Sequence, residues 1–93
     1  MTRKKLSAKE MEAALVNLQG WKVDGGKLVK HYEFENFAES LSFVNKIGGI
    51  AEAADHHPDI KFGWGYADIE LTTHDTGGLT HNDFDVAGKI ERV

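Results

Sequence analysis

The chain has 93 residues, 41% of them hydrophobic and 28% charged, a composition typical of one globular domain over 1–93 rather than of a disordered or membrane-spanning chain. A net charge of −4 with scattered Lys and Arg side chains argues against the basic face of a nucleic-acid-binding protein. The absence of cysteine excludes disulfides and thiolate metal sites, so we expect so small a domain to gain core by self-association.

The one basic cluster is Arg3-Lys4-Lys5, near the beginning of the sequence. No apolar run follows it, so it lacks the form of a signal peptide, and we expect a solvated tip. No stretch reaches the length of about 18 apolar residues that a membrane-spanning helix needs. These features, with the absence of cysteine, predict a cytoplasmic protein.

The first expected element is a helix from Ser7 to Leu18. Ser7 and Glu10 have the spacing of a capping box, and Gly20 is the residue type that often follows the end of a helix. Apolar side chains recur at helical spacing along it, at Met11, Ala14, Leu15 and Leu18.

Asp24-Gly25-Gly26 predicts a hairpin turn between strands at residues 21–23 and 27–34, because these residue types accept positive φ angles. Alternation in the second strand places two sets of side chains on opposite faces: Leu28, Tyr32 and Phe34 on one, and Val29, His31 and Glu33 on the other.

Asn36 and Glu39 predict the start of a long helix over residues 37–55, and Pro58 predicts its end near Asp55 or His56. Two apolar stripes run along it: Phe37, Leu41, Val44, Gly48 and Ala51, and beside them Phe43, Ile47, Ile50 and Ala54. Together they are wider than one sheet face requires, so we expect the second stripe to pack against another copy of the chain. The Gly48-Gly49 pair indicates either close packing against another backbone or a kink.

A second hairpin follows, with strands at residues 59–64 and 66–73, a loop over 75–78, and a final helix that begins at Thr80 and Asp83. Ile60, Phe62 and Trp64 are in phase, which predicts Trp64 in the core. The other expected core positions are Ala67, Ile69 and Leu71 in the last strand and Phe84, Ala87 and Ile90 in the final helix. The order of elements predicts a two-layer α+β fold, a four-stranded antiparallel sheet with helices packed on one face.

Four of the five histidines lie between positions 56 and 81. His56-His57-Pro58 follows the long helix and His74 follows the last strand, and these two junctions can lie close together. Because histidine titrates near neutral pH, three imidazoles at one cleft suit proton transfer. Glu52, four residues before His56, can orient that imidazole if the helix persists. Asp55 lies where the helix dipole disfavours a negative charge, which is a mild functional indication.

Each of these residues also has a purely structural interpretation. A histidine near a helix C-terminus is a favourable cation, a histidine at a strand end is usually a surface residue, and Thr80-x-x-Asp83 is a helix cap. A zinc site built from His56, His57 and His74 is the chemical alternative. Adjacent residues diverge on regular structure, and the chain has neither an HExxH motif nor a Cys/His ligand set, so we expect no metal.

A longer pattern resembles the signature of the pterin-4a-carbinolamine dehydratase family. It consists of Glu52-Ala53-Ala54-Asp55-His56-His57-Pro58, Trp64, Thr72-Thr73-His74, Gly78-Leu79 and Asp83. The order of elements is similar over nearly the whole chain, including the Leu18 and Trp21 pair. A His-His-Pro followed at this interval by Thr-His is more specific than any single motif above.

The resemblance implies a cofactor-free dehydratase that removes water from 4a-hydroxytetrahydropterin, the product left by aromatic amino acid hydroxylases, and yields quinonoid dihydropterin for tetrahydrobiopterin recycling. The implied catalytic set is His56, His57, His74 and Asp83, with Asp83 and Glu52 orienting histidines. The implied pterin contacts are Glu52, Asp55, Thr72, Thr73 and Asp75. The resemblance also implies a homodimer or homotetramer. A non-catalytic module, such as the dimerisation cofactor of a transcription factor, is the alternative function.

Overall fold

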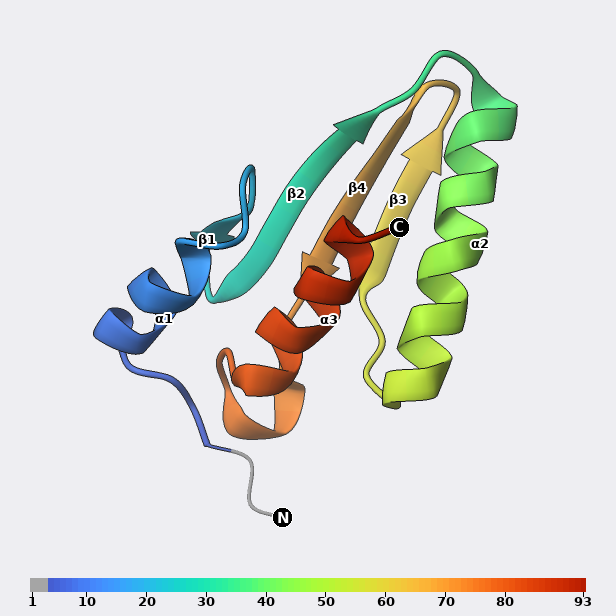
Figure 1. Ribbon diagram of the computed structural model, residues 1–93. Helices are drawn as coiled ribbons and strands as arrows, with labels where there is room; N and C mark the ends of the chain where they lie inside the picture. The colour runs from blue at the N-terminus through green and yellow to red at the C-terminus, as the bar shows by residue number, and fades with distance from the viewer. Residues whose placement is uncertain (1–3) are drawn as a thin grey trace.

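The computed structural model describes residues 4–93, so Arg3 of the predicted solvated tip lies outside the described residues, while Lys4 and Lys5 are exposed. The elements are α1 (Ala8–Leu15), β1 (Lys22–Asp24), β2 (Lys27–Glu33), α2 (Phe37–Ala54), β3 (Asp59–Gly63), β4 (Tyr66–Leu71), the 3-10 helix η1 (His74–Thr76) and α3 (His81–Glu91). Their order is the predicted one (Figure 1). Within the described residues, no helix is both long enough and apolar enough to cross a membrane.

The four strands form one antiparallel sheet in the order β1-β2-β4-β3. The two hairpins are joined at the centre, where β2 pairs with β4 and sets Leu28 opposite Leu71. The turn between β1 and β2 has φ angles of 59° at Gly25 and 78° at Gly26, as the sequence predicted. This pairing brings the end of β4, and the residues that follow it, next to the turn that joins β1 and β2.

The helices α2 and α3 lie on the same face of the sheet, with the apolar core between the two layers (Figure 1). The core includes the predicted residues of β4 and α3, of which Ala67, Ile69, Leu71, Ala87 and Ile90 are almost fully buried. The predicted two-layer α+β fold is therefore confirmed. Its arrangement sets the C-terminal end of α2 beside the N-terminal end of α3.

Trp64 is not a core residue, and the prediction that placed it there was wrong: its exposed fraction is 71%. β3 ends at Gly63, and Trp64 and Gly65 form the turn to β4, with φ 80° at Gly65. Because a turn breaks the alternation of a strand, the phase of Ile60 and Phe62 does not extend to Trp64. The first helix also ends earlier than predicted, at Leu15 instead of Leu18.

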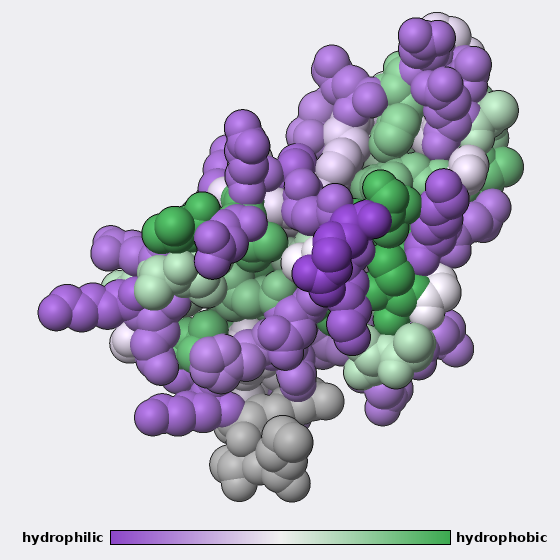
Figure 2. All heavy atoms as spheres, viewed as in Figure 1, coloured by the Kyte–Doolittle hydropathy of each residue, from purple (hydrophilic) through white to green (hydrophobic). Residues whose placement is uncertain are grey.

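Neither apolar stripe of α2 keeps to the face predicted for it: Ala51 of the first stripe is buried, but so is Ile47 of the second. The second stripe packs on the chain's own core: Ile47 is fully buried, and the ring of Phe43 lies 4.5 Å from that of Tyr32. Part of the first stripe faces solvent instead, with Phe37 44% and Leu41 40% exposed. Figure 2 shows apolar side chains along α2 and in the groove between α2 and α3, which is lined by Lys46, Gly49, Ile50, Ala53, Lys89 and Val93.

Candidate active site

The predicted catalytic residues come from three junctions at one end of the molecule: the end of α2, the segment after β4 and the start of α3 (Figure 1). The helix α2 stops because Asp55 takes a left-handed conformation with φ 49°, and the backbone N–H of His56 then bonds to the carbonyl of Ala51 at 3.2 Å. Pro58 cannot continue the helix. This turn directs the side chain of His56 into the molecule, where it is buried.

His56 and Asp83 form a buried pair between the two helix ends. The distance from His56 Nε2 to Asp83 Oδ1 is 2.6 Å, and the Asp83 side chain is completely buried. The other carboxylate oxygen, Oδ2, accepts hydrogen bonds from the backbone N–H of Thr80 at 2.9 Å and from the hydroxyl of Thr73 at 2.7 Å. A buried carboxylate is tolerated only when it is well paired, and this one is.

Asp83 therefore has both of the roles that the sequence left as alternatives. It closes the capping box of α3 with Thr80, and it also holds a histidine from another element. No buried polar side-chain atom within residues 4–93 is left without a hydrogen-bond partner. The burial and the complete hydrogen bonding fix the orientation of the His56 ring.

Glu52 pairs with His57 instead of His56, which corrects the i, i+4 expectation. The helix ends at Ala54, so the next residues no longer follow helical spacing, and Glu52 Oε2 bonds to Nε2 of His57. This pair is at the surface, where the His57 side chain is 53% exposed. The two adjacent histidines thus have different surroundings, one buried and one open to solvent.

The segment after β4 connects His74 to the buried pair. His74 is exposed at the start of η1, directly after Thr73, whose hydroxyl reaches Asp83. The hydroxyl of Thr72 donates to the carbonyl of Gly26 in the β1–β2 turn at 3.1 Å. Asp75 is exposed on η1, and Asp55 is exposed at the end of α2. Among residues 4–93 the ring of His74 makes no hydrogen bond, so it is available to a ligand.

The structure brings no three His, Asp, Glu or Cys side chains of the described range into an arrangement that could hold a metal ion. His56 and His57 come from adjacent positions but have separate carboxylate partners, Asp83 and Glu52. Independence of metal stays a prediction for the purified protein.

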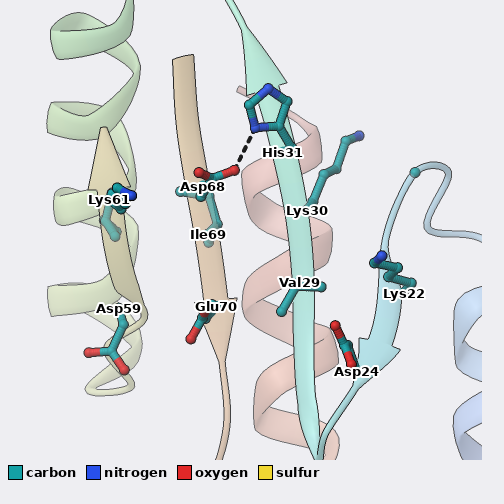
Figure 3. A pocket seen from close by; sticks show the side chains of 12 residues that line it. Lys22, Asp24, Val29, Lys30, His31, Asp59, Lys61, Asp68, Ile69 and Glu70 are labelled. Atoms are coloured by element: carbon teal, nitrogen blue, oxygen red, sulfur yellow. Dashed lines mark hydrogen bonds and ion pairs between the residues drawn. The ribbon is translucent and has the colours of Figure 1, made fainter. Parts of the chain in front are cut away.

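A second hollow lies on the sheet face opposite the helices, a groove of about 700 Å³ (Figure 3). Acidic and basic side chains from all four strands line it, and His31 Nδ1 lies 2.5 Å from Asp68 Oδ1. The hydrogen bond with Asp68, and then that with Glu33, raises the pKa of His31 above its ordinary 6.5. None of the predicted catalytic residues lines this groove.

The sequence did not predict that Thr73 and Thr80 belong to the buried network around Asp83. Thr80 was expected only as a cap, and Thr73 as a pterin contact. Their hydroxyls lie 2.9 Å apart, and Asp83 accepts from the Thr73 hydroxyl and from the backbone N–H of Thr80. The Thr80-x-x-Asp83 box was a signal for part of this network. The family resemblance implied that Asp83 orients a histidine, but no local pattern identified His56 as that histidine, because the two positions lie far apart in the sequence.

A four-stranded antiparallel sheet backed by helices, with a buried His–Asp pair and two exposed histidines at one end, describes a small α+β domain with a cluster of imidazoles and carboxylates. The profile of the family described as pterin 4 alpha carbinolamine dehydratase matches residues 4–93. The chain therefore belongs to the pterin-4a-carbinolamine dehydratase family.

Individual proteins agree with this assignment. A protein from Koribacter versatilis (strain Ellin345), provisionally named pterin-4-alpha-carbinolamine dehydratase, is 42% identical over 90 residues, 97% of this chain and 96% of that protein. One of the same provisional name from Rubrobacter xylanophilus is 46% identical over 89 residues, 95% of this chain and 83% of that protein. The crystal structure of a transcriptional coactivator/pterin dehydratase from Brucella melitensis has a TM-score of 0.90 at 32% identity, covering 96% of this chain and 97% of that one.

Proposed function

We propose that this protein is a dehydratase that removes water from 4a-hydroxytetrahydropterin by histidine acid–base catalysis. The observation that carries the proposal is the arrangement at the helix junction: a rigid, buried His56–Asp83 pair lies beside His57 and His74, which are open to solvent. Family membership supports the reaction, and the geometry supports the assignment of roles.

The proposed reaction needs one proton to be delivered and one to be removed. A general acid protonates the hydroxyl on C4a, the C4a–O bond breaks and water leaves. A general base takes the proton from N5, and the electron pair of that bond forms the C4a=N5 double bond of the quinonoid product. We assign these two proton transfers to His57 and His74, because their rings are exposed. General acid–base catalysis of this kind accelerates reactions by about 10²–10⁴-fold.

His56 has a more restricted part in the proposed mechanism. Its Nε2 is bonded to Asp83, so only Nδ1 is left for a ligand. Asp83 fixes the ring and the tautomer, as carboxylate partners of catalytic histidines do. Glu52 has the corresponding role for His57.

We propose that the pterin lies over the surface between the end of α2 and the segment of residues 72–75. Glu52, Asp55, Thr72 and Asp75 would contact it, since all four are at least partly exposed there. Carboxylate and hydroxyl oxygens accept hydrogen bonds from the N–H groups of a pterin ring.

We further propose that the protein works in the cytoplasm beside an aromatic amino acid hydroxylase, which supplies the 4a-hydroxy substrate, and serves tetrahydrobiopterin recycling. A homodimer or homotetramer is expected, with Phe37 and Leu41 of α2 at the contact. Both are apolar, partly exposed and on the outward face of that helix.

The alternative is a non-catalytic interaction module. The Brucella melitensis relative is described as a transcriptional coactivator as well as a dehydratase. The two functions differ in what they need: a module needs only its surface, whereas the enzyme needs the ring nitrogens of His57 and His74. The presence of all three histidines, His56, His57 and His74, favours the enzyme, because an interaction surface does not need them.

The test is a stopped-flow assay of freshly generated 4a-hydroxytetrahydropterin with His57→Ala and, as the matched control, His31→Ala. Both histidines are half exposed and paired with a carboxylate, but only His57 belongs to the proposed site. We expect His57→Ala to lower kcat by about 10²-fold and His31→Ala to leave it within about twofold of wild type. Equal rates for the two variants would refute the assignment of His57.

A further inference from the structure

Thr73 lies at the centre of the site and yet is closed to solvent. It directly precedes His74, but its exposed fraction is 1%. Its carbonyl oxygen is occupied as well, because it accepts from the backbone N–H of Thr76 at 3.3 Å and from the Thr76 hydroxyl at 3.0 Å. Neither its side chain nor its carbonyl is therefore available to a ligand.

The hydroxyl of Thr73 is one link in a directed chain of hydrogen bonds. A carboxylate only accepts, so the Thr73 hydroxyl must donate its proton to Asp83 Oδ2, at 2.7 Å. With that proton committed, the contact with Thr80 at 2.9 Å must run from the Thr80 hydroxyl to the Thr73 oxygen. The chain ends at His56, which bonds to the other oxygen of Asp83.

We propose that Thr73 is a positioning residue of the dehydratase site: its hydroxyl fixes the Asp83 carboxylate so that Oδ1 meets His56. This inference rests on the proposed function. The backbone N–H of Thr80 holds the same Oδ2, so two anchors on one oxygen determine the rotation of the carboxylate. These anchors, residues 73 and 80, bracket the loop that carries His74. One carboxylate therefore sets the position of His56 and of the segment that presents His74.

The kinetic test compares Thr73→Val, which is nearly isosteric but has no hydroxyl, with Thr73→Ser, which keeps it. We expect Thr73→Val to lower kcat about tenfold, the equivalent of one hydrogen bond to a charged group, with KM within about twofold of wild type. Thr73→Ser should restore kcat to within about twofold. A rise in KM alone would mean that Thr73 contacts the substrate, and would overturn the proposal.

Ser40→Ala is the matched control for loss of a buried hydroxyl. Ser40 is also completely buried, and its hydroxyl donates to the carbonyl of Gly63 at 2.6 Å, at the N-terminal end of α2, away from the site. We expect Ser40→Ala to lower the melting temperature and to leave kcat unchanged. Equal losses of kcat in Ser40→Ala and Thr73→Val would show a general effect of stability and refute the positioning role.

The ring ¹⁵N chemical shifts of His56 give a readout that does not depend on turnover. We expect them to change in Thr73→Val and to stay at wild-type values in Thr73→Ser and Ser40→Ala. If the wild-type protein fails to dehydrate the pterin, the proposed function is refuted. The His56 chemical shifts then test, without any activity measurement, whether Thr73 positions Asp83 and His56. Unchanged shifts in Thr73→Val refute the positioning role whatever the activity. Should Thr73→Val not fold, Thr73→Cys, whose S–H is a weak donor, takes its place.

Discussion

At the scale of single residues, the adjacent histidines have different energetic roles. His56 bonds to a carboxylate that has no access to water, whereas the His57–Glu52 pair is at the surface and screened by solvent. Breaking a buried pair leaves a charge without its partner and costs far more than breaking an exposed one. The same residue type at neighbouring positions should therefore differ in its effect on stability.

His56→Ala should lower the free energy of unfolding by about 3 kcal/mol, because Asp83 is left buried without its imidazole partner. His57→Ala is the control and should change it by no more than about 0.5 kcal/mol. Urea unfolding at neutral pH measures both. Equal stability losses in the two variants would mean that the Asp83 carboxylate is hydrated in solution.

The local part of the site was predictable and the tertiary part was not. The Thr80-x-x-Asp83 box is a pattern of neighbours, and it formed as expected. Glu52 and His56 also have the spacing of helical neighbours, but the left-handed Asp55 ended the helix between them. Periodicity carries no information on such a turn, nor on the contact between His56 and Asp83, which depends on how α2 and α3 pack.

At the scale of elements, hydrogen bonds of Glu91 connect the C-terminal end of α3 to side chains of the sheet and of the segment before it. Its Oε1 accepts hydrogen bonds from Trp21 Nε1 at 2.9 Å, from Lys30 Nζ at 2.5 Å and from the Tyr32 hydroxyl at 2.5 Å. Burial, and then the bond with Glu91, raises the pKa of Tyr32, so its hydroxyl stays a donor. Because α3 carries Asp83 at its other end, this cluster also limits how far that helix can shift.

Glu91→Gln should lower the free energy of unfolding by about 1 kcal/mol at neutral pH. The size of this decrease should depend on pH. Partial burial alone would raise the pKa of Glu91, but the hydrogen bonds from Lys30, Tyr32 and Trp21 lower it below the ordinary 4.5. A carboxyl whose pKa is lower in the folded chain adds stability above its unfolded pKa, and this stability is lost as the pH falls through the folded value.

The difference between wild type and Glu91→Gln should therefore be constant near neutral pH and shrink in acid, as Glu91 takes up its proton. Urea unfolding at a series of pH values measures it. A difference that stays the same from neutral pH into acid would contradict the account. It would show that the shape of the side chain, rather than its charge, holds α3.

Turn and cap residues in the sequence predicted which helices and strands form, but not every residue at which they end. Gly25 and Gly26 determine the first hairpin, and Asn36 caps α2 with an oxygen that accepts from the N–H of Glu39 at 2.9 Å. Trp64 was wrongly predicted as a core residue because its position continues the alternation of Ile60 and Phe62. The alternation does not show that the strand ends before Trp64. The outward face of α2 was misassigned because both stripes are apolar. Only the packing of Phe43 and Ile47 on the sheet decides between them.

At the scale of the whole molecule, we expect self-association because the single chain leaves apolar surface uncovered on α2. Phe37 and Leu41 are partly exposed, and a Cβ added at Gly48 or Gly49 would meet nothing within 4 Å. A partner could therefore approach this helix closely. We expect sedimentation at micromolar concentration to show a dimer or a tetramer and no major monomer.

Leu41→Glu should shift that equilibrium toward the monomer, because it places a charge in an apolar contact. Val16→Glu is the control: Val16 is also an exposed apolar residue, but it follows α1. A wild-type chain that sediments as a monomer, or a Val16→Glu variant that dissociates as readily as Leu41→Glu, would exclude the contact through the outward face of α2.

The dehydration rate of 4a-hydroxytetrahydropterin with wild-type protein, before and after dialysis against a chelator, tests the central claim most directly. Histidines do the proposed chemistry, so we predict an acceleration of at least about 10²-fold over buffer near neutral pH, with the same kcat after dialysis. Loss of activity on dialysis that returns with added zinc would show that a metal ion does the work assigned to the imidazoles. A rate equal to that in buffer would contradict the assignment of this protein as a dehydratase.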